Sequence, residues 1–228
     1  FGATTIYALN HTIAKEVMPT YIQGFGFVQV RLLGAAMLFW LASLFVPKQR
    51  IDRADYPRMV LCAFLGMALN MLCFFKGIEL STPINSAVLI TLTPILVFIF
   101  SAILIKETLL LPRIVGVGLG FVGALVLILF GSEIRQDAPN IPLGNLLFLF
   151  NATAFGMYLV LVKSLSAKYT TVHLLKWLFS IGFLMSLPVT YKEFNAVTWT
   201  SLPFEAIWRF AYVVVGLSLI HISEPTRR

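Results

Sequence analysis

Few residues in this chain could act chemically, and most are polar side chains inside long apolar stretches. Arg31 is the clearest, because Val17–Val30 and Leu32–Pro47 on either side carry no charge. A charge at the centre of a membrane helix costs about 2.5–3.5 kcal/mol on insertion scales, so such a residue indicates function. Arg31 could attract an anionic or zwitterionic substrate or pair with Glu16; the alternative is a structural arginine whose end reaches the membrane surface.

A second group lies near the N-terminus of the chain. Tyr7, His11 and Lys15 follow one another at intervals of four, so on a helix they share one face. We expect this face, with the neighbouring Asn10, to line a substrate site. His11 has an ordinary pKa near neutrality and could carry protons, or it could be an ordinary hydrogen-bonded residue. Lys15 could equally lie at the membrane interface.

Later apolar stretches supply the other candidate substrate-binding residues, which are Asn70, Phe74, Asn85, Thr91, Pro94, Asn151 and Tyr158. A proline inside a membrane helix frees a backbone carbonyl, which is tolerated where the break meets protein or a water-filled cavity. Pro94 is therefore either a substrate-facing hinge or a kink used only for packing. Asn151 and Tyr158 are two turns apart and share a helix face.

Catalytic and metal-binding patterns are absent from the sequence. There is no HExxH, no GxSxG and no pair of embedded carboxylates. Cys62 and Cys73 lie in one apolar stretch, where they are expected to be buried small hydrophobes rather than a disulfide or metal pair. We therefore expect no catalytic residue, no metal and no cofactor, and a protein that is not an enzyme.

The composition predicts the surroundings of these residues. Of 228 residues, 59% are hydrophobic and 12% charged, with a mean hydropathy of +0.89. A soluble domain is about 25% charged, so this chain cannot cover itself with a hydrated surface. The pattern excludes an ordinary soluble enzyme, a disordered chain and a nucleic-acid module, despite the net charge of +7. It predicts an all-α polytopic membrane protein with the lipid bilayer as a partner and no nucleic acid.

Charge-free runs of about 20 residues locate the membrane helices. We expect helices near 1–17, 25–46, 58–76, 84–105, 113–131, 142–164 and 173–191, with an eighth beginning near 207. Prolines fall near most of the expected ends, where a helix start tolerates them.

Positive charge alternates between successive loops. The loops after the second, fourth and sixth helices contain eight basic residues, which are Lys48, Arg50, Arg53, Arg58, Lys106, Arg113, Lys163 and Lys168. The other loops contain only Lys76, Arg135 and Lys192. Because cytoplasmic loops carry the excess of Lys and Arg, the N-terminus is predicted to be cytoplasmic.

The chain also resembles itself. At an offset of 148 residues, Lys15 falls on Lys163 and Tyr7 on Phe155. Five helices separate the two copies, and an odd number turns the second copy over in the membrane. Inverted repeats are typical of alternating-access transporters, whose site lies at the repeat interface near the middle of the bilayer.

Several motifs resemble the EamA domain of the drug/metabolite transporter superfamily. They are Phe75-Lys-Gly-Ile-Glu-Leu-Ser-Thr-Pro-Ile-Asn-Ser-Ala, Leu92-Thr-Pro94, Lys106-Glu107-Thr and Gly116-Val-Gly-Leu-Gly120 with Gly123. The resemblance covers residues 3–216 and implies two inverted five-helix repeats, ten helices when complete, of which this chain holds about seven and a half. It implies a first repeat over 1–131 and a truncated second repeat over 142–216. The glycine run is expected to be a face for close helix packing.

The same resemblance implies a secondary transporter that moves a small metabolite, such as an amino acid or drug-like compound. It implies gating or structural roles for Glu107 and Lys163, a multi-pass location in the bacterial inner membrane, and a possible homodimer. Residues 217–228 resemble a translated sequencing adapter and are excluded from functional reasoning.

Two other functions would require residues that the sequence does not supply in a recognisable pattern. An intramembrane enzyme would need a Ser/His or metal constellation, and His11 has no evident partner. A seven-helix receptor of the retinal type would need a lysine deep in its last helix, and Trp177–Tyr191 contains none.

Overall fold

The computed structural model describes residue 18 and residues 21–105, 115–116, 118–120, 122–123, 126, 138–199, 202–205 and 208–212. Within these residues, five helical spans are long and apolar enough to cross a membrane, which are Gly24–Ala42, Arg53–Leu80, Pro83–Leu104, Ile141–Lys168 and Thr171–Asn195. The prediction of an all-α polytopic membrane protein is confirmed. The helix expected over 1–17 and most of that over 113–131 lie outside the described residues.

Helix α2 (Gly24–Ala42) is the first described span. It ends four residues earlier than predicted, where the Ser43 hydroxyl donates a hydrogen bond of 2.7 Å to the carbonyl of Trp40. A loop then leads to the short 3₁₀ helix η1 (Arg53–Asp55).

The next span is not the uniform helix that the sequence predicted over 58–76. It consists of α3 (Tyr56–Ala63), a π-helical turn η2 (Phe64–Leu69) and α4 (Asn70–Leu80). Pro57 lies in the first turn of α3, where its missing N–H leaves no bond unmade. The π turn matters because single wide turns of this kind are frequent at functional sites.

The following span is broken, as Pro94 predicted. Helix α5 (Pro83–Ile90) ends before Thr91, and α6 (Thr93–Ile105) begins two residues later with Pro94 in its first turn. The side chain of Thr82 caps α5 by accepting a hydrogen bond of 3.2 Å from the Asn85 amide.

Helices α8 (Ile141–Lys168) and α9 (Thr171–Asn195) are both longer than the predicted 142–164 and 173–191. Asn140 caps α8 by accepting a hydrogen bond of 3.1 Å from the Leu143 amide. The two helices are joined by only Tyr169 and Thr170.

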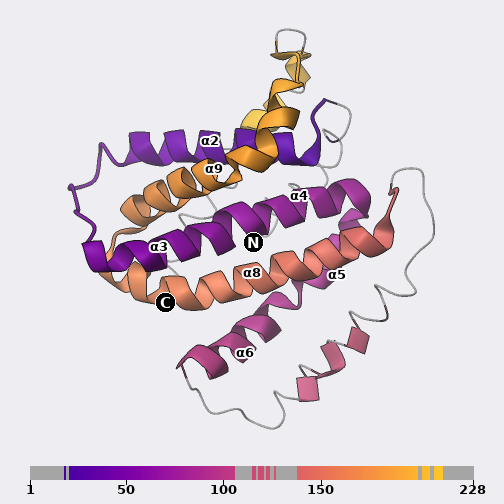
Figure 1. The fold of residues 1–228 in the computed structure, drawn as a ribbon, viewed down its shortest axis with the longest axis horizontal. Coiled ribbons are helices and arrows are strands. Elements are labelled where there is room, and N and C mark those ends of the chain that lie inside the picture. The colour runs from indigo at the N-terminus through magenta and orange to yellow at the C-terminus, as the bar shows by residue number, and fades with distance from the viewer. Residues whose placement is uncertain are drawn as a thin grey trace.

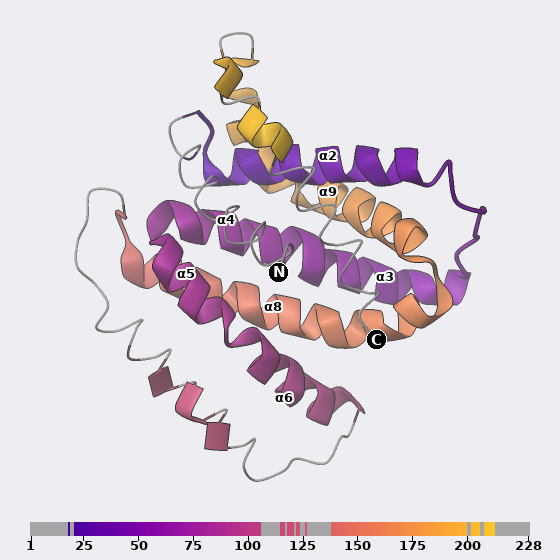
Figure 2. The ribbon, with the colours of Figure 1, turned by 180° about the vertical axis from the view of Figure 1, so that it is seen from behind.

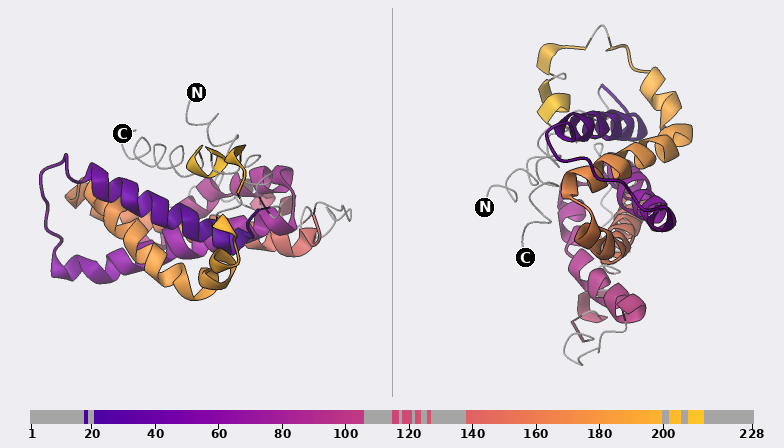
Figure 3. Two further views of the ribbon diagram at one scale, coloured as in Figure 1. Left: turned by 90° about the horizontal axis from the view of Figure 1, so that it is seen from above. Right: turned by 90° about the vertical axis from the view of Figure 1, so that its left-hand side faces the viewer.

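The helices form an elongated bundle in which α2 runs antiparallel to α9, and α4 runs antiparallel to α8 (Figure 1). Helix α2 packs along α9, and α4 packs along α8, while α5 and α6 touch the rest of the described bundle mainly through α8 (Figures 1 and 2). The end-on view in Figure 3 shows α2, α9 and the α3–α4 span side by side. Large apolar side chains remain exposed on the outside, among them Leu44, Phe45 and Leu184, as expected for a surface that faces lipid.

The basic loops meet at one end of the bundle. Lys168 Nζ lies 2.9 Å from Asp55 Oδ2, and the Arg58 guanidinium donates a hydrogen bond of 2.6 Å to the Ser164 hydroxyl. The loop after α2 and the α8–α9 turn are therefore on the same side of the membrane, as the predicted alternation of spans requires. We call this end of the bundle the basic end.

Among the described residues, the glycine run predicted as a packing face has a close neighbour only at Gly120. A Cβ placed on Gly120 would lie 2.7 Å from the Ile95 side chain, whereas no described atom lies within 4 Å of the same position on Gly116 or Gly123. The closest helix contacts instead involve Gly66, Gly144 and Gly182, which the sequence did not single out.

Candidate functional site

Arg31 lies in the second turn of α2 and is buried, with 8% of its surface exposed. Its guanidinium carbon lies 5.4 Å from the centroid of the Phe75 ring on α4. A guanidinium over an aromatic face is stabilised by the ring quadrupole. Phe74 and Phe27 pack edge-on against Phe75 at 5.0 Å and 4.9 Å, so the arginine rests on a rigid aromatic support.

Asn70 and Asn151 join α4 to α8 in the middle of the bundle. The Asn151 side-chain amide donates a hydrogen bond of 2.9 Å to the Asn70 carbonyl, and the Asn70 amide donates one of 3.4 Å to the Asn151 carbonyl. Each amide thus keeps its own side-chain oxygen for another donor. This reciprocal pair holds the two helices in register at membrane depth.

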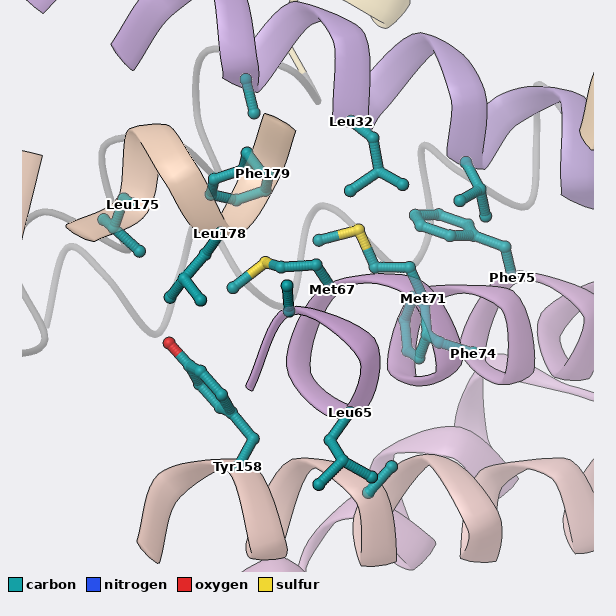
Figure 4. Close-up of a cluster of buried hydrophobic side chains, with 14 of the residues drawn as sticks. Leu32, Leu65, Met67, Met71, Phe74, Phe75, Tyr158, Leu175, Leu178 and Phe179 are labelled. Atoms are coloured by element: carbon teal, nitrogen blue, oxygen red, sulfur yellow. The ribbon is translucent and has the colours of Figure 1, made fainter. Parts of the chain in front are cut away.

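Tyr158 lies on the same face of α8 as Asn151 and covers the π turn. Its ring is so close to Gly66 that a Cβ there would lie 2.5 Å from two ring carbons. On the other side of the turn, a Cβ on Gly182 of α9 would lie 2.5 Å from the Met67 Cβ. Figure 4 shows the Tyr158 hydroxyl pointing from α8 towards Leu178 on α9, with Met67 nearby. At the π turn, α8 and α9 therefore both approach the same span closely.

The remaining described candidates lie apart from this centre. Asn85 is buried at the junction of α4, α5 and α8. Its side-chain amide donates a hydrogen bond of 3.3 Å to the Ser81 hydroxyl, and that hydroxyl donates one of 2.8 Å to the Asn145 side-chain oxygen. Thr91 and Pro94 are exposed at the break between α5 and α6. Lys163 is exposed on the basic end of α8. Tyr7, Asn10, His11, Lys15 and Glu107 lie outside the described residues.

A buried polar cluster between α2 and α9 was not predicted. The Gln29 side-chain oxygen accepts hydrogen bonds of 2.6 Å from Thr190 and 3.3 Å from Ser186, and all three residues are buried. Gln29 is uncharged and lies in an apolar run. The only sequence signal for this cluster is therefore a polar amide side chain among apolar residues. The cluster fixes the register of α2 on α9 next to Arg31.

Two carboxylates at the other end of α2 were also missed. Glu79 of α4 accepts a hydrogen bond of 2.9 Å from the Gly24 amide, and Glu193 of α9 accepts bonds of 2.8 Å and 3.0 Å from Phe25 and Gly26. Carboxylates are stabilised at a helix N-terminus by its unpaired N–H groups and dipole. Both glutamates were expected in loops, because the predicted helices ended at 76 and 191.

At the basic end, Tyr169 ties the first loop to the α8–α9 turn. Its hydroxyl donates a hydrogen bond of 2.7 Å to the Asp55 carboxylate and accepts one of 3.0 Å from the Asp52 backbone amide. The Asp52 amide acts to lower the pKa of the phenol, but desolvation and the hydrogen bond to Asp55 outweigh it, so the pKa lies above its ordinary value. Since a raised pKa favours the neutral form, the phenol supports the fold at every pH below its unfolded value near 10.

Replacing Tyr169 by phenylalanine is expected to loosen the loop around Asp52. The Asp52 amide loses its acceptor, so its hydrogen exchange, measured by mass spectrometry, should become faster in Tyr169→Phe. Tyr191→Phe is the matched control, since Tyr191 is exposed and forms no described hydrogen bond. Unchanged exchange at Asp52 in Tyr169→Phe would contradict this role of the phenol.

Comparison with known proteins agrees with this architecture. Residues 1–129 match the model of the EamA-like transporter family. The uncharacterized transporter YetK of Bacillus subtilis (strain 168) is 23% identical over 196 residues, covering 86% of this chain and 58% of YetK. YyaM, an uncharacterized transporter of the same strain, is 24% identical over 185 residues, covering 78% of this chain and 61% of YyaM.

A third relative, an uncharacterized transporter of Archaeoglobus fulgidus, is 23% identical over 221 residues, which are 93% of this chain and 74% of that protein. The chain spans about three fifths of the length of the two Bacillus relatives. No solved structure matches it significantly. Because the family model covers more than half of the 228 residues, this multi-pass membrane protein belongs to the EamA-like transporter family.

Proposed function

We propose that this chain is part of a secondary transporter that carries a small metabolite, such as an amino acid or drug-like compound, across the bacterial inner membrane by alternating access. The observation that carries the proposal is the buried Arg31 on the Phe75 ring within a membrane-spanning helix. A charge embedded in a membrane helix is costly to insert and marks a candidate substrate pathway. A substrate carboxylate is the group that its guanidinium fork fits.

The neighbouring contacts support movement about this position. The α5–α6 break and the π turn η2 interrupt the regular hydrogen bonds of two spans, and such interruptions are typical of hinges in transporters. The polar pairs Asn70–Asn151 and Gln29–Thr190 connect α4 with α8 and α2 with α9. If the two repeats correspond as the sequence predicts, α2 and α9 are equivalent helices that meet across their interface.

Residues of the chain that the structure does not describe complete the proposed site. Tyr7, His11 and Lys15 would line it from the first helix, and Glu107 would act at the basic end. We propose a cytoplasmic N-terminus and a function without catalysis or cofactor. The possible homodimer also stays a prediction.

The test is flux into proteoliposomes that contain the gene product as its genome encodes it. We expect uptake or exchange of at least one radiolabelled carboxylate-bearing metabolite, above protein-free vesicles and saturable in substrate. A folded protein that carries no member of a broad panel of amino acids, organic acids and drug-like cations would contradict the proposal. Conversion of a compound without its movement would favour the intramembrane-enzyme alternative.

A further inference from the structure

A cavity of about 560 Å³ lies at the basic end, away from Arg31. It is lined by residues of the end of α2, the following loop and the start of α9. Its charged lining residues are Lys48, Arg50 and Lys176, and none of its lining residues is an aspartate or glutamate. A pocket with three cations and no carboxylate is complementary to an anion.

Lys176 is the central feature of this cavity. It is only 9% exposed and lies about 8 Å along α9 from the first residue of that helix, at a rise of 1.5 Å per residue. Its ammonium lies 4.4 Å from the Trp40 ring centroid and 5.9 Å from that of Trp177. Among the described residues no carboxylate pairs with it. A buried ammonium that lies beside two aromatic rings and pairs with no described carboxylate lacks the anion that would offset its desolvation.

The other side of the cavity is held in place by hydrogen bonds. The Gln49 side chain donates a hydrogen bond of 2.8 Å to the Lys168 backbone carbonyl and accepts one of 2.9 Å from the Thr170 backbone amide. The Gln49 backbone amide donates a hydrogen bond of 3.4 Å to His173 Nε2. Because Nε2 accepts this bond, the neutral ring carries its proton on Nδ1, which lies 3.0 Å from the Thr170 hydroxyl. The loop is thus fixed over the start of α9, while the side chains of Lys48 and Arg50 remain exposed beside the cavity.

The surroundings of the cavity match the boundary between headgroups and acyl chains. Trp40 and Tyr56 line it and are exposed, and aromatic side chains of this kind favour the membrane interface. Leu44, which also lines the cavity, and Phe45 beside it are 75% and 89% exposed. An occupant would therefore meet cations within the cavity and apolar side chains at its rim.

We propose that this cavity binds the phosphate headgroup of an anionic phospholipid from the adjoining leaflet. Lys176 is the inner contact, Lys48 and Arg50 are the outer ones, and the acyl chains lie against Leu44 and Phe45. Basic pockets between membrane helices on the cytoplasmic side bind such headgroups. A soluble phosphate ester shares the same anionic group but would leave the apolar rim unoccupied.

The test uses quenching of tryptophan fluorescence, because Trp40 and Trp177 line the cavity. The purified protein is placed in neutral phosphatidylcholine vesicles that contain a small fraction of brominated phosphatidylglycerol or, separately, brominated phosphatidylcholine. The ratio of the two quenching efficiencies gives the preference for the anionic lipid. We expect phosphatidylglycerol to be preferred in the wild type, and Lys176→Gln to lower this preference about fivefold, as expected for one cation near the surface.

Two further variants make the result decisive. Lys192→Gln removes an exposed cation from the other end of α9 and should leave the preference unchanged. Lys48→Gln with Arg50→Gln changes only exposed loop side chains, so it should lower the preference even if Lys176→Gln does not fold. Equal quenching by both lipids in the wild type would overturn the proposal. Loss of the preference in millimolar glycerol phosphate would also overturn it, by assigning the cavity to a soluble ester.

Discussion

Replacing Gly144 by alanine is expected to lower the free energy of unfolding by about 2 kcal/mol. A Cβ at this position of α8 would lie 2.5 Å from the Ser81 Cβ, 2.9 Å from the Ser81 backbone nitrogen and 3.0 Å from the Gly77 carbonyl oxygen. Two of these atoms are backbone, so no side-chain rotation relieves the overlap and α4 must move away from α8. Overpacking costs about 1–3 kcal/mol, and we expect the upper part of that range.

A gain in helix propensity partly offsets this loss. Alanine is favoured over glycine in a helix by about 0.5–1 kcal/mol, which is why the net effect is smaller than the overlap alone suggests. The displacement would also lengthen the 2.8 Å hydrogen bond from Ser81 to Asn145. Reversible unfolding in mixed detergent micelles, followed by circular dichroism, measures the change.

Gly116→Ala is the matched control for Gly144→Ala. No described atom lies within 4 Å of a Cβ on Gly116, so only the propensity gain applies there. We expect this variant to be as stable as the wild type or slightly more stable. The opposite sign at the two glycines is the critical result, and equal effects would show that α4 and α8 are not as close as described.

The sequence predicted the spans well because length and apolar character alone decide whether a helix can cross a bilayer. Pro94 located a helix break for the same kind of reason, since a missing N–H acts locally. The π turn at Phe64–Leu69 could not be predicted, because every residue there is apolar or glycine and one extra residue per turn leaves the composition unchanged.

The candidate site was predicted from one embedded charge and from single polar or aromatic residues in apolar stretches, so polar residues whose partners lie on another helix were missed. Arg31 stood out between two uncharged runs, whereas Gln29, Ser186 and Thr190 are uncharged and their cluster depends on how α2 meets α9. Lys176 comes directly before the uncharged run Trp177–Tyr191, and the sequence predicted no role for it. Its burial depends on the loop after α2 folding over α9, which is a tertiary contact that no local pattern contains.

Arg31 carries the second large effect. In the transporter we expect Arg31→Gln to raise the KM for a carboxylate-bearing substrate about 30-fold, because hydrogen bonds to a charged group contribute about 1.5–3 kcal/mol. Arg31→Lys keeps the charge but loses the planar contact with Phe75, so we expect an intermediate KM. Arg53→Gln, which removes an exposed arginine at the basic end, is the control and should leave KM unchanged.

Measuring both KM and the amount of folded protein distinguishes a substrate-binding role of Arg31 from a purely structural one. A binding arginine raises KM in protein that is folded normally, and it does so more for carboxylates than for the corresponding amides. A structural arginine instead lowers the maximal rate in proportion to the folded fraction, with the same KM for both. If Arg31→Gln shows this second pattern, the guanidinium only fixes the depth of α2, and the substrate is bound by other groups, such as those around Asn70 and Tyr158.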